Sequence, residues 1–509
     1  MQKTNFWCVV MMIVSTVTYA TIIDVPGDYS TIQAGLNAAT QGDTVLVQPG
    51  TYVENIVWPP VNGIKLFSAG DSSNSVIDGN NTGRIISVTS TGNIDTSTVI
   101  QGFRITHGSS IQSGGGIDCQ NSSVTIRSCA IISNSANLYG GGIACRDQSN
   151  SEVINCYISG NSAITCGGGG IACLSSNPNI INCIIIGNQS LGEHEGGGGG
   201  GICFFYCNPI LTDVILIGNS AIYGGSIYIC SSSPNLTDVT ISGNTANYGG
   251  GICCFDCGSE GPILIDVTVT ENTAYDGGGI WCYWSSPTLL RVRVTRNTAS
   301  NMAGGIALCF HSNPSIEHCT IAENHDTLDG DGIFTIDNCL PTISYCNIFS
   351  NGIGLHNWFI SPIVNCPNNW WGDASGPYNP NYNPSGHGDS TNIYVNPLPF
   401  LTEPDSLAPP AGISEHHFQP PTTFKLFPNY PNPFNATTTI AFELSVISKV
   451  TLKIYNILGQ TVATTINGQM MSSGRHEVTF SDTNLSSGVY FYHLSAGRNT
   501  AVGKMVLLK

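Results

Sequence analysis

Residues 140–161 read Gly-Gly-Gly-Ile-Ala-Cys-Arg-Asp-Gln-Ser-Asn-Ser-Glu-Val-Ile-Asn-Cys-Tyr-Ile-Ser-Gly-Asn, and close variants of this stretch recur along the chain. The Ile after the glycines and the closing Asn stay in phase over nine repeats, at steps of 25 to 31 residues. The positions are Ile117, Ile143, Ile171, Ile202, Ile227, Ile252, Ile280, Ile306 and Ile333, and Asn134, Asn161, Asn188, Asn219, Asn244, Asn272, Asn297, Asn324 and Asn351. A fixed period of this length is the signature of a repeat architecture.

Each repeat contains short segments in which apolar and polar residues alternate and β-branched residues are frequent, which is typical of strands. Gly, Asn, Ser and Pro lie between these segments and indicate turns. No repeat shows a helical period, so helix-bearing repeats are disfavoured. Two or three short strands in each repeat, stacked about 4.8 Å apart, predict an all-β fold: a parallel β-helix of about a dozen coils.

The stacking also predicts which side chains face the interior. Cysteine alternates with Val, Phe, Ile and Leu at two equivalent positions, as a small buried hydrophobe does. One column is Cys129, Cys156, Cys183, Val214, Val239, Val267, Val292, Cys319 and Cys346, and the other is Cys119, Cys145, Cys173, Phe204, Ile229, Cys254, Cys282 and Leu308. We expect core thiols there. The better disulfide candidates lie off these columns, at Cys203, Cys207, Cys230, Cys253, Cys257 and Cys309.

The repeated Asn and Gly residues have a structural interpretation. The Asn side chain recurs at the same turn, where it can bond the backbone and its counterpart on the next coil, forming a ladder. The glycines supply positive φ at tight turns. Residues 31–39 are the one expected helix near the start, and we expect it to cap the open end of the stack.

Composition narrows the range of partners. Charged residues make up 10% of the 509 residues and the net charge is −17, which argues against nucleic acid or an anionic membrane as a partner. Residues 1–20 have the pattern of a secretory signal peptide, with an apolar run and small residues before a cleavage point after Ala20. No later stretch is apolar for long enough to span a bilayer. We expect an exported protein.

Residues 21–401 resemble the right-handed parallel β-helix proteins of the pectin-lyase-like superfamily. The resemblance rests on the opening segment at 30–56, on Val76-Ile-Asp-Gly and on the closing Asn368-Asn-Trp-Trp-Gly-Asp-Ala-Ser-Gly-Pro. The glycine and asparagine motifs are also similar to the repeats of chlamydial polymorphic outer-membrane proteins. These resemblances indicate the fold and leave the function open, because one fold carries many different sites.

The tail resembles a different family. After a Pro-rich linker at 402–423, residues 424–509 begin with Phe424-Lys-Leu-Phe-Pro-Asn-Tyr-Pro-Asn-Pro-Phe-Asn, and their pattern predicts a small β-sandwich. This segment resembles the C-terminal sorting domain of type IX secretion cargo. The resemblance implies the type IX machinery as a partner and a secreted or outer-membrane-associated location.

The first candidate for chemistry is an acidic turn at His325, Asp326, Asp329 and Asp331. Carboxylates beside a histidine could supply an acid/base pair or ligands for Ca²⁺, and the alternative is a solvated turn. The Gly-His-Gly at 386–388 mimics a polygalacturonase motif, but it lies outside the coils, so we do not take it as catalytic.

The second candidate is a column expected to point outward from the strand before each Asn: Asp213, Asp238, Asp266, Arg291 and His318. Three stacked carboxylates repel one another unless a cation lies between them, so the three aspartates are candidate Ca²⁺ ligands and Arg291 is a candidate catalytic residue. The alternatives are an exposed Asp266–Arg291 ion pair and a solvated acidic stripe.

The sequence favours a surface β-helix that contacts extracellular polysaccharide, with Tyr157, Tyr228 and Trp281 expected to be exposed on its strands. A non-catalytic adhesin or structural surface protein is the first alternative. A polysaccharide lyase or glycoside hydrolase is the second, although no catalytic signature of the superfamily is present.

Overall fold

The structure is a computed structural model. It describes residues 20–508 except 90–93, 193–196, 328–330, 360–361, 412–423, 430, 436, 445–447, 458–459, 472–473, 482–484 and 498. The predicted signal peptide, apart from Ala20, therefore lies outside the described residues, as does Asp329.

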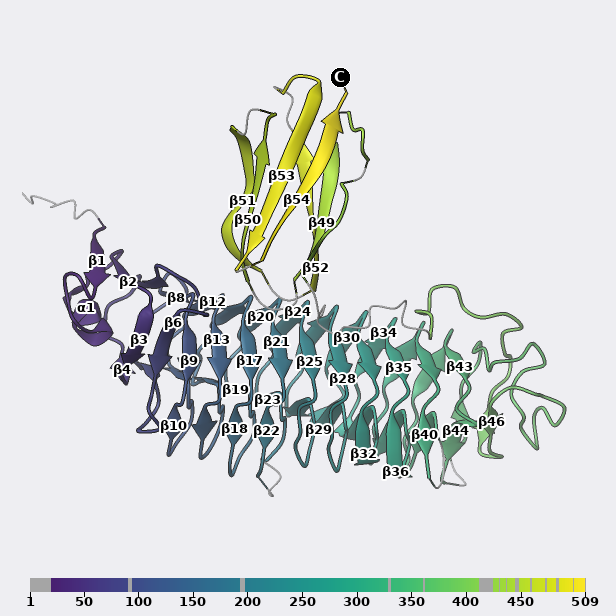
Figure 1. The fold of residues 1–509 in the computed structure, drawn as a ribbon. Coiled ribbons are helices and arrows are strands. Elements are labelled where there is room, and N and C mark those ends of the chain that lie inside the picture. The colour runs from purple at the N-terminus through teal and green to yellow at the C-terminus, as the bar shows by residue number, and fades with distance from the viewer. Residues whose placement is uncertain are drawn as a thin grey trace, which may run out of the picture.

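Three long parallel sheets form the rod (Figure 1). Sheet 1 runs from β1 (Ile22–Val25) to β42 (Thr342–Ser344), sheet 2 from β3 (Gly50–Val53) to β43 (Asn347–Phe349), and sheet 3 from β4 (Ile56–Val57) to β46 (Ser390–Thr391). Equivalent residues of successive coils pair in register, so that Ile143 pairs with both Ile117 and Ile171. The predicted parallel β-helix is confirmed.

Both predicted interior columns are buried in one core that runs through the rod. Burial raises the pKa of the Cys145 thiol to about 12, which keeps the thiol neutral at physiological pH. The nineteen cysteines of the described residues are all free thiols, so the bridges expected off the columns are not found. Two of the cysteines expected to form bridges belong to this core instead: Cys207 is part of it and Cys257 packs against it.

The asparagine ladder is present as predicted. Asn134 Nδ2 donates to Asn161 Oδ1 at 3.0 Å and to the Ile105 carbonyl oxygen at 3.0 Å. The pattern continues along the rod to Asn351, whose Nδ2 donates to Asp389 Oδ2 at 2.9 Å. Every amide in this series is buried, so the ladder satisfies polar groups that water cannot reach.

The glycine turns are needed because the chain passes close to itself. Gly224 has φ +61°, and a Cβ there would lie 2.2 Å from the Ile227 carbonyl oxygen. Glycine avoids that overlap at this turn because it has no side chain. The equivalent position two coils further is Gly277, and one coil beyond it is Ala303, with φ +49°.

The two ends of the rod are closed. Helix α1 (Ile32–Ala38) lies at the start, where Thr31 caps it and Glu54 accepts the backbone N–H groups of Ile32 and Gln33 at 2.9 Å. The helix therefore has the predicted capping position. At the other end, Trp371 is fully buried in the core.

The C-terminal domain is all β. One sheet contains β48 (Lys425–Leu426), β49 (Thr437–Leu444) and β52 (Gly474–Ser481), and the other contains β50 (Ser448–Tyr455), β51 (Thr461–Met471), β53 (Gly488–Ala496) and β54 (Asn499–Leu507). The strands pair antiparallel, and Ile440, Phe442, Leu452 and Leu494 are among the residues of a core of their own. This is the small sandwich that the sequence predicts.

Candidate functional site

A second apolar cluster covers the outer face of sheet 3. It lies over β23 (Ile202–Phe205), β26 (Ile227–Cys230), β29 (Ile252–Gly258), β33 (Ile280–Ser285) and β37 (Ile306–Cys309). In each strand, the residues one and three places after the repeated Ile point away from the core. Earlier coils carry Ala144 and Ala172 at the first of these positions, whereas two later coils carry the large rings of Tyr228 and Trp281 there.

Nine rings on this face touch one another in an unbroken series, which we call the aromatic band. Its members are Tyr139, Phe205, Tyr223, Tyr228, Tyr248, Phe255, Trp281, Tyr283 and Phe310. Neighbouring ring centroids lie between 4.6 and 6.0 Å apart. Phe255 and Tyr283 are stacked with an interplanar angle of 6°, as are Tyr223 and Tyr248 at 14°. Such geometry fixes the rings relative to the rod.

The exposed fractions of the rings contradict the prediction that Tyr228 and Trp281 are exposed on the strands. Tyr228 and Trp281 are buried, with 1% and 6% of their surface exposed, because other rings cover them. Tyr223, Tyr248 and Tyr283 are half-buried and reach the surface. Tyr157, the third ring predicted to be exposed, lies in β17 (Tyr157–Ser159) on sheet 2, away from the band.

Two buried carboxyl groups lie close to the band. Asp276 ends β32 (Thr273–Asp276) and pairs with Tyr248 across the coils, and Asp326 ends β40 (His325–Asp326). Both are buried, with 4% and 6% exposed. Asn301 Nδ2 donates to Asp276 Oδ1 at 2.7 Å, and the Ala303 N–H donates to Asp326 Oδ2 at 3.0 Å.

The protonation of Asp276 reflects that burial. Desolvation raises the pKa of its carboxyl group, the hydrogen bond from Asn301 opposes the rise, and the negative charge of Asp326 adds to it. Burial therefore favours the protonated form of this carboxyl group more than exposure to water would. Asp276 was not among the residues singled out from the sequence; its only signal is that it stands where other repeats carry Tyr223 and Tyr248 before the glycines.

Three of the four residues predicted in the acidic turn, His325, Asp326 and Asp331, lie close together in the structure. Asp331 Oδ1 accepts the Asp326 N–H at 2.7 Å and lies 3.6 Å from His325 Nδ1. His325 is exposed, and Asp331 is less so. Arg291 is not part of this group, because it lies on another side of the coil and binds Asp266. The catalytic assignment of these residues stays a prediction.

The acidic column occupies a turn rather than a strand, which corrects the sequence interpretation. Asp213, Asp238 and Asp266 have φ between +54° and +55° and are exposed between a sheet 1 strand and a sheet 2 strand. Both carboxylate oxygens of Asp266 accept from Arg291 at 2.7 Å, and His318 Nδ1 lies 2.9 Å from Asp405 Oδ2. No group of three or more His, Cys, Asp or Glu suited to a metal occurs in the described parts of the chain.

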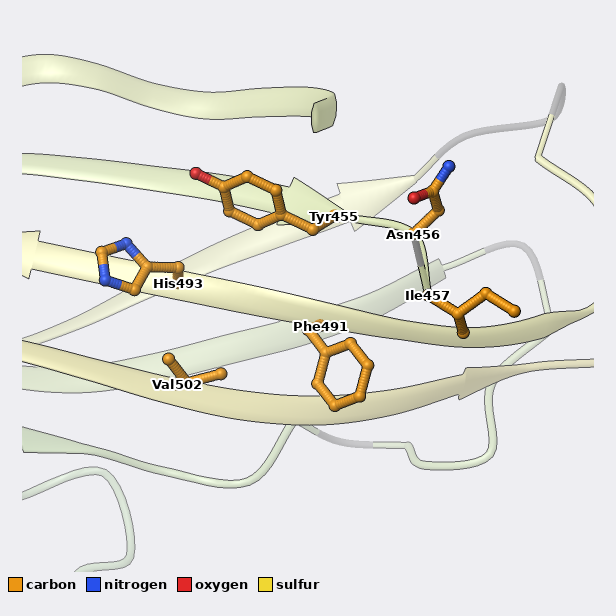
Figure 2. A pocket seen from close by; sticks show the side chains of 6 residues that line it. All are labelled: Tyr455, Asn456, Ile457, Phe491, His493 and Val502. Carbon is orange, nitrogen blue, oxygen red and sulfur yellow. The ribbon is translucent and has the colours of Figure 1, made fainter. Parts of the chain in front are cut away.

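The C-terminal domain has a shallow pocket of its own (Figure 2). Its lining residues come from the end of β50, from the turn after β50 and from the middle of β53 and β54: Tyr455, Asn456, Ile457, Phe491, His493 and Val502. Ile457 and Val502 are 73% and 63% exposed, so this surface is open and apolar. It shares no residue with the aromatic band, and the two are separate features.

Comparison with known families matches both parts of the chain. Residues 429–508 match the secretion system C-terminal sorting domain, residues 266–366 match the right handed beta helix region, and residues 238–254 match the Chlamydia polymorphic membrane protein repeat. No curated protein matches the chain. An alginate lyase from Paenibacillus sp. str. FPU-7 is a similar solved structure, with 12% identity and a TM-score of 0.29 over 74% of this chain and 99% of that one.

These matches confirm the right-handed parallel β-helix and the type IX sorting domain predicted from the sequence. The sorting domain indicates type IX secretion, and the protein is secreted or held at the cell surface in association with the outer membrane. Within the described residues, no helix is long and apolar enough to cross a membrane.

Proposed function

We propose that this exported β-helix binds extracellular polysaccharide along the aromatic band. The observation that carries the proposal is the unbroken series of ring contacts from Tyr139 to Phe310 on one outer face of the rod. Aromatic rings present apolar faces to the C–H surface of a sugar, and tyrosine adds a hydroxyl group for hydrogen bonding. Coils about 4.8 Å apart repeat the contact along one glycan chain, so weak contacts add up.

Binding of the full chain to soluble polysaccharides, measured by affinity electrophoresis, tests this function. Tyr248→Leu removes a half-buried ring of the band, and we expect weaker retardation by the polysaccharide. Tyr157→Leu is the matched control, since it removes a tyrosine from sheet 2 and should leave binding unchanged. A Tyr248→Leu protein that is retarded as strongly as the wild type, with an equal melting temperature, would count against the proposal.

Glycoside hydrolysis is the second candidate function, and the buried carboxyl pair supports it. A hydrolase uses one carboxyl group as a proton donor and a second as a base or nucleophile. Asp276 and Asp326 lie beside a face that we propose binds sugars, and Asp276 has the raised pKa. Release of reducing ends from a bound polysaccharide, lost in Asp276→Asn, would establish hydrolysis. Binding without such release would leave the protein as a non-catalytic adhesin.

A further inference from the structure

The turn that follows each sheet 3 strand has a left-handed backbone. Its residue lies four places after the repeated Ile, and its φ is between +48° and +57° in nine successive coils. These residues are Asn121, Asp147, Ser175, Tyr206, Ser231, Asp256, Trp284, Phe310 and Asp337. Asn and Asp tolerate this conformation because their short polar side chains bond locally, whereas a bulky side chain is strained there. Tyr206, Trp284 and Phe310 are therefore unexpected.

Burial accounts for these three rings only in part. Their exposed fractions are 70% for Tyr206, 47% for Trp284 and 40% for Phe310. A strained conformation that is not offset by burial is a reason to look for a ligand contact. The alternative residues Asn and Asp, present elsewhere in the same column, would relieve the strain. They would give up the contact of Phe310 with the Tyr283 ring and that of Trp284 with the His311 ring.

Phe310 is itself a member of the aromatic band, and Tyr206 and Trp284 directly follow the band residues Phe205 and Tyr283. The ring centroids of Tyr283 and Phe310 lie 4.6 Å apart, and Trp284 lies 5.2 Å from the ring of His311. At about 4.8 Å per coil, Phe310 is one step from Trp284 and Tyr206 is three steps away on the other side, roughly 14 Å. The rings thus cover a length of four coil steps along one edge of the band.

The charges around these rings are negative. Asp256 and Asp337 occupy the same column as Trp284, on the coils before it and two beyond it. The outward positions of sheet 3 from Cys203 to Ile336 hold no charged residue among those described. An anionic chain would be repelled by these carboxylates at short range, and the outward positions from Cys203 to Ile336 offer it no Lys or Arg among the described residues.

We propose that Tyr206, Trp284 and Phe310 contact the ligand directly, and that this ligand is an uncharged polysaccharide rather than a polyuronate. The inference rests on the proposed function and adds to it the class of glycan and the residues that select it. Stacking on exposed ring faces requires only C–H surfaces, which uncharged sugars supply without the repulsion that carboxylates would meet.

Asparagine substitution gives the sharpest test, because Asn suits the left-handed turn. We compare the full chain with Trp284→Asn, Tyr206→Asn and Phe310→Asn, and use Ser231→Asn in the same column as the control. The probes are hydroxyethyl cellulose and galactomannan as uncharged chains, and alginate and polygalacturonate as anionic ones. We expect each ring variant to bind the uncharged probe about tenfold more weakly, with a melting temperature equal to or above that of the wild type.

The outcomes separate this inference from the function beneath it. Ring variants that bind an uncharged glycan like the wild type would overturn the contact residues and leave the polysaccharide function intact. Preferential binding of the anionic probes would overturn the class of ligand. No binding of any glycan by the wild type would end both proposals. If the melting temperatures of the ring variants fall together with binding, the rings serve folding and the proposal is overturned. If light scattering shows a dimer that Trp284→Asn dissociates, the rings serve self-association and the proposal is likewise overturned.

Discussion

From Ser128 to Tyr345, each coil passes from sheet 1 to sheet 2 through one residue with a φ close to +50°. Asn155 and Asn182 occupy this position before Asp213 and Asp238, and their shared feature is a short polar side chain that tolerates a left-handed backbone. Backbone conformation is therefore sufficient to explain the aspartates of the column. Asp266 is in addition held by Arg291, which occupies both of its carboxylate oxygens.

Addition of Ca²⁺ tests whether the column also binds a cation. We expect millimolar Ca²⁺ to leave the melting temperature unchanged, because a ligand of the folded state must raise it and a built site of three ligands is missing from the described residues. Asp238→Asn should raise the stability slightly, by about 0.5 kcal/mol or less, since it removes repulsion at an exposed site. A Ca²⁺-dependent rise that Asp238→Asn abolishes would instead establish the calcium site predicted from the sequence.

The raised pKa of the buried Asp276 carboxyl group determines how the stability of the fold changes with pH. Its pKa is raised in the folded protein, so its contribution to stability is greatest when it is protonated and is lost as the pH rises above the ordinary value of 3.8. Asp276→Asn keeps an oxygen that can accept from Asn301 and removes the charge. We expect the variant to be more stable than the wild type at pH 7 and equal to it near pH 3.5, measured as the difference between urea unfolding curves. A difference that stays constant with pH would contradict this.

At the scale of the coil, periodic features could be predicted and features built from several turns could not. The interior columns and the Asn ladder recur at one place in the repeat, so alternation alone located them. The aromatic band joins strand positions to Tyr223 and Tyr248, which precede the glycines and approach the strands only once the coil is closed. The burial of Asp276 has the same origin, because the neighbouring turns cover it.

The ladder should be a main source of stability for the coils. Asn244→Ala removes an amide that bonds Asn219 on one side and Asn272 on the other, and leaves the buried Asn219 N–H without an acceptor. We expect a loss of about 3 kcal/mol or more, since each unsatisfied buried group costs about 1–3 kcal/mol. Asn235→Ala, at an exposed position in β27 (Asn235–Thr237), is the control and should change the unfolding free energy by less than about 0.5 kcal/mol. Equal effects of the two changes would show that the ladder contributes little.

At the scale of the whole molecule, the chain stays in contact with the rod beyond residue 401. Asp405 exchanges two hydrogen bonds with Asn347, at 2.8 and 3.0 Å, and pairs with His318. Thr320 Oγ1 donates to the Pro409 carbonyl oxygen. The start of the Pro-rich segment, residues 402–411, is thus bound to sheet 2, and we propose that the rod domain extends to Ala411.

Two truncations test the boundary and the export address together. A chain that ends at Ala411 keeps the contacts of Asp405 and lacks the sorting domain, so we expect it to fold as a β-rich rod and to remain in the periplasm of a type IX host. A chain that ends at Leu401 should also remain there, but should be less stable by about 1–3 kcal/mol, because Asn347 loses both of its partners on Asp405. Cell fractionation measures export, and urea unfolding of the purified rods measures stability.

Delivery of either truncation to the surface would contradict the sorting role of residues 424–509. Equal stability of the two rods would show that the rod domain ends at Leu401. Because export and stability are measured separately, the sorting assignment and the domain boundary are tested independently.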